Sequence, residues 1–563
     1  MKFSDYKYER PNIGQLKEKF EIAIEKINSA EKFEEIKEEY KEINKVRMTF
    51  STMASLAYIR HSVNTLDEFY DKEREFFDEN GPVYGEFEYN LSLALVKSKF
   101  NQELRNHYGD LLFDQIELSL KTFKPELIGL FQKENKLASE YDKLIASAKI
   151  EFKDKIHNLS QMGPYLQNLD RNIRKDAETA SMSFFEENES KFDEIYDELV
   201  KIRTEIAHKL GYKNFVQLGY DRMGRTDYDS LDVANYRKQV REDLVPIAVR
   251  LYEEKGKRLG IKELKSYDLS LNFKSGNPMP KGDKDYLVGE ALKMYQEMSP
   301  ESGEYFKFMV DRELLDLETK PGKSGGGYCT YLPDYQSPFI FSNFNGTSGD
   351  VDVLTHEAGH GFQAYSSRHM EVPEYFNPTM ESAEIHSMSM EFFAWPWMEK
   401  FFDNADKYRY SHLVGTITFI PYGVCVDEFQ HGIYENPEMT KDERKALWKK
   451  LENIYTPFKK YDNEFLNKGT YWFRQGHIFS VPFYYIDYTL AQICAHQYWI
   501  KNQKDHEDAW NSYYKLCTLG GSKSFTNLLK EAKLDNPFND GSIKKVTKEI
   551  NKWLDEFDHT KLI

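Results

Sequence analysis

The chain has 563 residues, of which 40% are hydrophobic and 15% aromatic, and its formal net charge is −17. A chain of this length exceeds one simple core, so we expect two or more domains, and its apolar content excludes a disordered protein. The acidic balance argues against nucleic acid and anionic membranes as partners, and we expect neither.

The N-terminal stretch MKFSDYKYER has no apolar run behind its lysine, which argues against a secretory signal. No stretch reaches the roughly 20 apolar residues that cross a bilayer. The cysteines lie far apart without a CxxC pair, a pattern typical of free thiols in a reducing compartment. These observations predict a cytoplasmic protein.

Residues 12 to about 210 predict an almost wholly helical region. Segments such as 12–28, 32–45 and 190–210 mix Glu and Lys with apolar residues at spacings of three and four. Helix stops are expected at GPVYGEF near residue 81 and at MGPY near residue 162. This half gathers no histidines or carboxylates at ligand spacing, so we expect an architectural role.

The composition changes near 320–350, where Gly, Ser, Pro and β-forming residues accumulate. Residues 337–344, SPFIFSNF, form the clearest strand in the chain, with Asn345-Gly346 after its end. The triple glycine at 325–327 predicts a mobile loop. It is not expected to bind phosphate, because it lacks the GxxxxGK[ST] motif of a phosphate-binding loop. From Asp350 onward the pattern returns to helix.

The segment THEAGH at 355–360 is the shortest stretch that could carry a reaction. Residues four apart on a helix lie roughly 40° apart on one face, so His356 and His360 can both aim a nitrogen at one Zn²⁺. Glu357 leaves in a neighbouring direction and can act as general base at an open coordination position. The alternative is a polar helix face with two solvated histidines. The apolar neighbours of the motif argue against it, because buried ionisable groups without partners are costly.

A catalytic zinc of this type needs a third protein ligand. The pattern HExxHxxGxxH fails, because Gln363 and Ser366 occupy its glycine and third histidine. We therefore expect a carboxylate from a later helix. The candidates are Glu371, Glu374, Glu381, Glu384 and Glu391.

Glu384 is the favoured candidate. Asn377-Pro378 predicts a helix start near 378, and on that helix Glu384 shares a face with small and apolar residues. A carboxylate on such a face is costly unless a cation meets it. Glu391 repeats this face and could orient a histidine from behind. The alternative for Glu384 is a partly exposed carboxylate at the edge of the face.

Addition of water to an amide builds negative charge on the carbonyl oxygen, and donors aimed there accelerate the reaction. The segment 474–492 offers such donors. Tyr485 and Tyr488 would share one face of a helix that begins after Pro482, and His477 precedes them. The alternative is that these tyrosines are packing residues in an aromatic-rich chain. We assign the polar segment 427–431, DEFQH, to a structural hydrogen-bonding network.

Together these motifs resemble the M3 family of metallopeptidases, which includes thimet oligopeptidase and neurolysin. The oligoendopeptidase F and Pz-peptidase branch is the most similar. The resemblance covers most of the chain and is most specific from about 320 to 490, through THEAGHGFQ, ESAEIHSMSMEFF, DEFQHGIYENP and HIFSVPFYYIDY. It implies one zinc ion per chain, held by His356, His360 and Glu384.

The resemblance also implies roles for the other candidates. Glu357 would be the general base, and His477, Tyr485 and Tyr488 would face the tetrahedral intermediate. The spacing from the histidine to the tyrosines is shorter than in mammalian members, so Tyr484 stays an alternative to Tyr485. The Tyr-x-x-Tyr spacing favours Tyr485.

The implied fold is mainly α: an elongated, two-lobed helical zincin with a small β-sheet beside a deep active-site channel. An N-terminal helical domain, 1–195, would form one wall of the channel, and 196–563 would be the catalytic domain. The strand 337–344 would be a sheet edge on which a peptide pairs its backbone. The loop 325–327 would be a flap.

The predicted function is zinc-dependent cleavage of internal bonds in short unfolded oligopeptides, by a monomer or an oligomer. One alternative is a zinc exopeptidase, which needs a charged anchor for one end of the peptide; Arg368 and Lys323 are the candidates. The other is a non-catalytic zinc-containing peptide-binding protein, which predicts a closed four-ligand shell.

Overall fold

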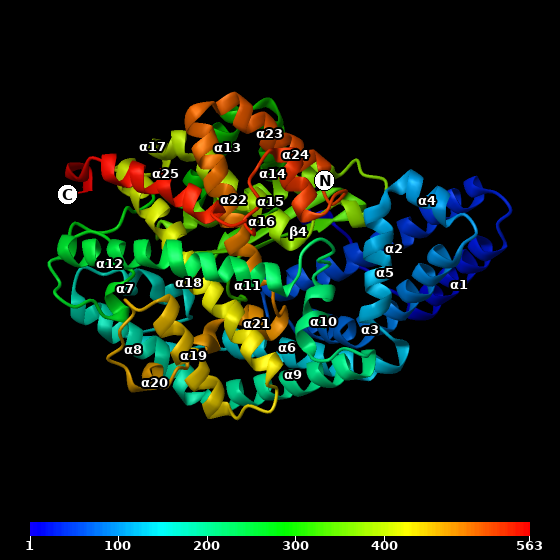
Figure 1. Cartoon of the computed structure of the whole chain (residues 1–563), viewed down its shortest axis with the longest axis horizontal. Coiled ribbons are helices and arrows are strands. Elements are labelled where there is room, and N and C mark those ends of the chain that lie inside the picture. The colour runs from blue at the N-terminus through cyan, green and yellow to red at the C-terminus, as the bar shows by residue number, and fades with distance from the viewer. Residues whose placement is uncertain (563) are drawn as a thin grey trace.

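The computed structural model describes residues 1–562. Helices α1 to α5 form a lobe that projects from the larger body (Figure 1). Their bounds are α1 Ile13–Ser29, α2 Phe33–Val63, α3 Glu68–Lys97, α4 Asn101–Tyr108 and α5 Asp110–Thr122. Asn12 caps α1 by accepting the Gln15 N–H at 3.1 Å, which meets one of the unpaired donors of the first turn. The lobe has an apolar core of its own, to which these helices contribute.

The predicted helix stop near residue 81 is wrong, because α3 runs through Gly81 and Pro82. Pro82 has no N–H to give to the carbonyl of Asp78, four residues earlier. Asn135 on a neighbouring helix donates to that carbonyl instead, at 3.2 Å. This second donor satisfies the Asp78 carbonyl and reduces the cost of the missing N–H, so the helix continues.

The body begins with the elements between the first lobe and the central sheet. They are α6 Ile128–Ala146, β1 Ile150–Phe152, β2 Lys155–His157, α7 Gly163–Leu166, α8 Arg171–Glu187, α9 Glu189–Leu210, α10 Phe215–Arg222, α11 Ser230–Gln239, a π-helical turn Val240–Leu244, α12 Val245–Leu259, α13 Lys284–Met298 and α14 Pro300–Asp311. The predicted helix 190–210 matches α9, which ends at Gly211 with a φ of 91°. A positive φ is cheap only for glycine, which fixes the stop.

A three-stranded sheet follows, in the order β3-β5-β4. Its strands are β3 Leu315–Glu318, β4 Tyr328–Leu332 and β5 Ser337–Phe344. The predicted strand 337–344 matches β5 residue for residue. Its expected position at an edge is wrong, since β3 pairs with it in parallel and β4 antiparallel. Every residue of β5 except Asn343 is buried, which suits a central strand.

The remaining elements are helical. They are α15 Gly349–Ser367, α16 Met380–Phe393, α17 Met398–Phe401, α18 Ala405–Glu435, α19 Lys441–Tyr455, α20 Glu464–Asn467, α21 Gly476–Ser480, α22 Tyr485–Lys504, α23 His506–Leu519, α24 Phe525–Ala532 and α25 Ser542–Glu556. The predicted mainly α fold with a small sheet is confirmed. The division into domains at 195/196 stays a prediction.

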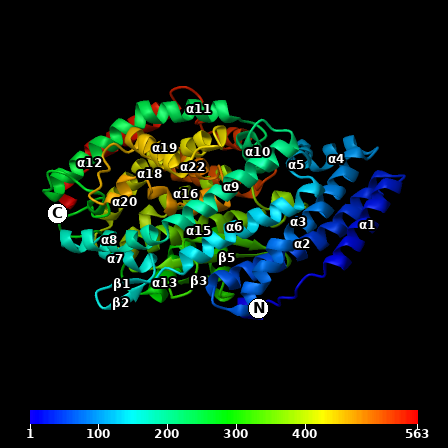
Figure 2. The same cartoon turned by 90° about the horizontal axis from the view of Figure 1, so that it is seen from below.

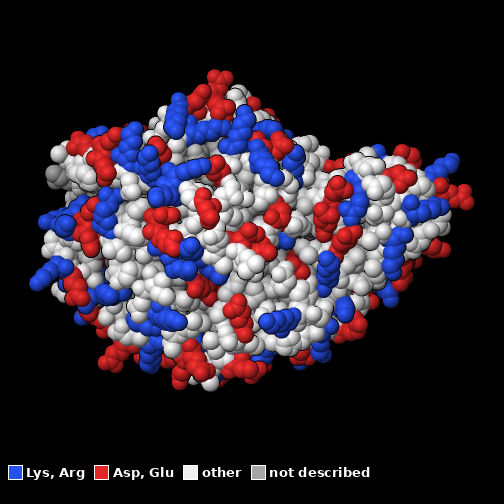
Figure 3. All heavy atoms as spheres, in the orientation of Figure 1, with Lys and Arg blue, Asp and Glu red and all other residues white. Residues whose placement is uncertain are grey.

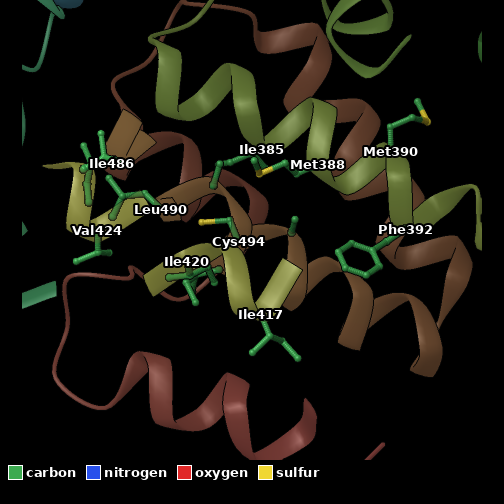
Figure 4. Close-up of a cluster of buried hydrophobic side chains, with 14 of the residues drawn as sticks. Ile385, Met388, Met390, Phe392, Ile417, Ile420, Val424, Ile486, Leu490 and Cys494 are labelled. Atoms are coloured by element: carbon green, nitrogen blue, oxygen red, sulfur yellow. The ribbon is translucent and has the colours of Figure 1, made fainter. Parts of the chain in front are cut away.

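Helix α16 lies at the centre of the body, packed between α15 and α22. Figure 4 shows a cluster of apolar side chains from α16, α18 and α22, among them Ile385, Ile420 and Leu490. All three are fully buried. At roughly 25 cal/mol per Å² of apolar area removed from water, such a cluster strongly resists rotation or sliding of α16. Whatever α16 carries on its other face is therefore held on a rigid support.

Figure 2 shows the sheet and α15 beneath the same central helices, with α6 and α9 alongside. Within residues 1–562, no helix combines the length and apolarity needed to cross a membrane. Positive and negative side chains are intermixed over the face seen in Figure 3.

Candidate functional site

Helices α15 and α16 bring three ligand-type side chains together. The Glu384 Oε2 atom lies 3.2 Å from His356 Nε2 and 3.3 Å from His360 Nε2. One ligand atom from each residue lies within 4.8 Å of the others. Gly359 permits this approach of the two helices, because a Cβ atom there would lie 2.6 Å from the His386 carbonyl oxygen. The glycine between the two histidines therefore allows the close contact of α15 with α16.

The three side chains differ in their access to water. The Glu384 side chain is 1% exposed, whereas those of His356 and His360 are 19% and 18% exposed. Burial acts to raise the pKa of Glu384, but the two imidazoles outweigh it and hold the pKa well below its ordinary value. Glu384 is therefore an anion at neutral pH, and the two imidazoles beside it are partly accessible to solvent.

Glu391 lies behind His356 and bridges two histidines. Its Oε1 lies 2.7 Å from His356 Nδ1, and its Oε2 lies 2.7 Å from His412 Nε2. Trp395 donates its indole N–H to His412 Nδ1 at 3.2 Å, so the proton of a neutral His412 is on Nε2. A carboxylate that accepts from His356 Nδ1–H leaves the Nε2 lone pair of that ring free to bind a cation.

Glu357 is buried beside the imidazoles, and its Oε2 atom has no hydrogen-bond partner. The loop 325–327 passes over it: a Cβ at Gly327 would lie 3.2 Å from Glu357 Oε1. Burial raises the pKa of Glu357, while the His356 and His360 charges act to lower it. A buried carboxylate oxygen without a partner is costly, and its position beside two imidazoles makes Glu357 a candidate to act on another molecule.

The residues of the predicted oxyanion group lie together around α21 and the start of α22. His477 Nε2 lies 3.1 Å from the Tyr488 hydroxyl. The Tyr485 ring centroid lies 5.0 Å from that of His477. Tyr484 lies nearest the metal-ligand group, because its hydroxyl donates to Glu384 Oε1. Sequence spacing could not reveal this contact, since 100 residues separate the two side chains.

The turn before α22 is held from outside. Phe483 has a φ of 66°, a left-handed conformation that is costly for a residue with a side chain. Its carbonyl accepts from Arg225 at 2.6 Å, and its N–H donates to Gln430 Oε1 at 2.8 Å. The Phe483 ring occupies space at Gly219, where a Cβ would lie 2.4 Å from it. The polar segment 427–431 therefore contributes Gln430 to the support of the tyrosines.

The other candidate carboxylates lie apart from the two imidazoles. Glu374 pairs with Arg47 at 2.6 Å, and Glu371 lies 3.4 Å from His107. Glu381 accepts from Thr379 at 2.8 Å.

Both candidate peptide anchors are engaged within the protein. The Lys323 ammonium is fully buried and donates to Asp316 and to backbone carbonyls. The Arg368 guanidinium stacks 3.5 Å from the centroid of the Tyr365 ring.

Comparison with known proteins gives a consistent result. Residues 165–547 match the sequence model of peptidase family M3, and residues 3–123 match that of the peptidase M3 N-terminal domain. The group B oligopeptidase PepB of Streptococcus agalactiae is 23% identical over 534 residues, covering 88% of this chain and 86% of that protein. An oligoendopeptidase F homolog of Borreliella burgdorferi is 24% identical over 398 residues, covering 67% of this chain and 65% of that protein.

Solved structures agree with these matches. A structure of Pz peptidase A with an inhibitor is 53% identical, with a TM-score of 0.98, and covers 99% of this chain and 100% of its own. Oligoendopeptidase F of Enterococcus faecium shares the fold, with a TM-score of 0.64 at 16% identity over 97% of both chains.

Proposed function

The chain belongs to peptidase family M3 and is a metallopeptidase, and we propose that it is a zinc-dependent endopeptidase that cleaves internal bonds of short unfolded oligopeptides. The observation that carries this proposal is the position of Glu357. Its unpartnered carboxylate oxygen lies beside a group of two imidazoles and one carboxylate. A peptidase that activates water needs this combination of a cation site and an adjacent free base.

The donor set fits a zinc ion. Two imidazoles and a carboxylate are a common ligand set of catalytic zinc, and such sites keep a further position open. Among residues 1–562 the group has three members, His356, His360 and Glu384. A zinc ion bound there would polarise the scissile carbonyl and make an attacking water molecule more acidic. A non-catalytic zinc protein with a closed shell would need a fourth ligand, which this group lacks.

The chain's own residues supply the proton transfers. Glu357 takes a proton from the attacking water and passes it to the nitrogen of the leaving amine, so it ends each cycle as it began. Tyr485, Tyr488 and His477 are the proposed donors to the oxygen that becomes negative. The contact of Tyr484 with Glu384 makes Tyr484 a further candidate. The proposal assigns the donor role to Tyr485 and keeps Tyr484 as its alternative.

The Glu357→Gln variant tests this assignment. It keeps the shape of the side chain and all three proposed ligands but cannot accept a proton. General acid–base catalysis contributes roughly 10²- to 10⁴-fold, so kcat on a quenched fluorescent peptide should fall by about that factor while zinc content stays at that of the wild type. Activity close to wild type would refute the role of Glu357.

A peptide blocked at both ends separates the endopeptidase from an exopeptidase. We expect internal cleavage of this peptide, detected by mass spectrometry of the products. An exopeptidase would leave it intact. The proposal includes a cytoplasmic location, which the scattered free cysteines support.

A further inference from the structure

Arg474 has a free guanidinium close to the proposed active site. It ends the short helical turn Tyr471–Arg474, three residues before His477, and its side chain is exposed. Its hydrogen bond within the protein runs from Nη1 to the Tyr471 hydroxyl at 3.0 Å. Within residues 1–562, no carboxylate oxygen forms an ion pair with it. Most of its five N–H donors are therefore available to another molecule.

A row of aromatic rings connects Arg474 to the proposed oxyanion group. The Arg474 guanidinium carbon lies 5.0 Å from the centroid of the Tyr471 ring. The Tyr471 ring centroid lies 6.0 Å from that of Tyr422, which is a neighbour of Tyr485. Burial raises the pKa of Tyr485, and the Arg474 charge acts to lower it.

The residue next to Arg474 contacts the proposed oxyanion group directly. Gln475, the next residue, lies 2.8 Å from His477 Nδ1 through its Nε2 atom. Its Oε1 atom accepts from the Tyr422 hydroxyl at 2.9 Å. The ring centroid of Tyr422 lies 5.9 Å from that of Tyr485. The contacts that fix His477 therefore also fix the backbone next to Arg474.

A second cation, Lys459, lies near Arg474 in a chain whose net charge is −17. Lys459 lies on the same aromatic cluster, with its Nζ 3.0 Å from the centroid of the Tyr471 ring. Glu452 balances Lys459 at 3.5 Å, and Arg474 has no such counter-ion. Burial acts to raise the pKa of Tyr471, but the Arg474 and Lys459 charges outweigh it and lower that pKa. A further acid, Glu178, accepts from Ser266 at 2.6 Å.

We propose that Arg474 binds a carboxylate of the peptide substrate, and that this contact selects which peptides are cleaved. The inference rests on the proposed peptidase function. The planar guanidinium matches a carboxylate in a two-pronged geometry that lysine cannot reproduce. The carboxylate comes from the C-terminus of the peptide or from an Asp or Glu side chain. A contact with the C-terminus favours peptides with a free end, and a contact with an Asp or Glu side chain favours acidic peptides.

Two matched pairs of peptides test this proposal on the zinc-loaded enzyme. The first pair differs only in a free or amidated C-terminus, and the second only in Glu or Gln at one position, varied along the peptide. Charge-assisted hydrogen bonds are the strong class, so in one pair the carboxylate form should have a kcat/KM about tenfold or more higher, mainly through KM. The pair that responds identifies the source.

The Arg474→Gln variant should abolish this discrimination while it still cleaves the uncharged peptide at close to the wild-type rate. Arg474→Lys should restore part of it, because the charge returns without the fork. Arg368→Gln is the matched control and should discriminate as the wild type does.

No discrimination by the wild type, unchanged discrimination in Arg474→Gln, or an equal loss in Arg368→Gln would each overturn the proposal. Failure of the proposed function has a different result, since neither member of a pair would then be cleaved by zinc-loaded enzyme.

Discussion

Replacing Glu391 should weaken metal binding, although its carboxylate is not one of the three proposed ligands. Glu391 accepts from His356 through one oxygen and from His412 through the other, each at 2.7 Å. In Glu391→Gln, one of these oxygens becomes an NH₂ group that faces a ring N–H. Whichever way the amide turns, one hydrogen bond is lost and two donors meet, so the support of the His356 ring is weakened.

Carboxylates that orient a ligating histidine contribute about 10- to 100-fold in metal affinity, or about 1.4–2.8 kcal/mol. We expect a weakening of zinc binding in this range, measured by competition with a chelator of known affinity. Glu381→Gln is the control, because Glu381 is also buried on the same helix but contacts Thr379. Wild-type affinity in Glu391→Gln, or an equal loss in Glu381→Gln, would refute the reasoning.

Three further predictions concern packing and pH. Gly359→Ala should push α15 from α16 and lower the free energy of unfolding by about 1–3 kcal/mol, which reduces the melting temperature; an unchanged melting curve would count against it. Gly219→Ala should displace Phe483 and lower kcat with little change in zinc content, which is measured alongside. Burial lowers the pKa of His431 to about 4 and of His496 to about 3. Below pH 6.5 the unfolded chain therefore binds more protons than the folded chain, and the free energy of unfolding decreases as the pH is lowered. At pH 5 the loss is about 2 kcal/mol per histidine, and urea denaturation of His496→Asn should show a smaller loss between pH 7 and pH 5 than the wild type.

Features that depend on a few consecutive residues could be predicted from the sequence. The bounds of β5 follow from its apolar run between Pro338 and Asn345-Gly346. The pairing of His356 with His360 follows from their spacing of four on one helix. Both predictions need only the local period of the chain, which tertiary contacts seldom change.

Features that depend on distant partners could not be predicted. The central position of β5 depends on β3 and β4 pairing on both of its sides, and a strand's own sequence does not name its neighbours. Helix α3 passes through Pro82 because Asn135, 57 residues from Asp78, supplies the missing donor. The contact of Tyr484 with Glu384 likewise exists only after α16 and α22 have packed together.

The most direct test of the central claim is an anomalous difference map at the zinc absorption edge, from crystals of the wild-type protein. We expect one peak at about 2.0–2.2 Å from His356 Nε2, His360 Nε2 and a Glu384 carboxylate oxygen. The peak should have no fourth protein ligand. A peak elsewhere, none at all, or a fourth side chain that closes the coordination shell would contradict it.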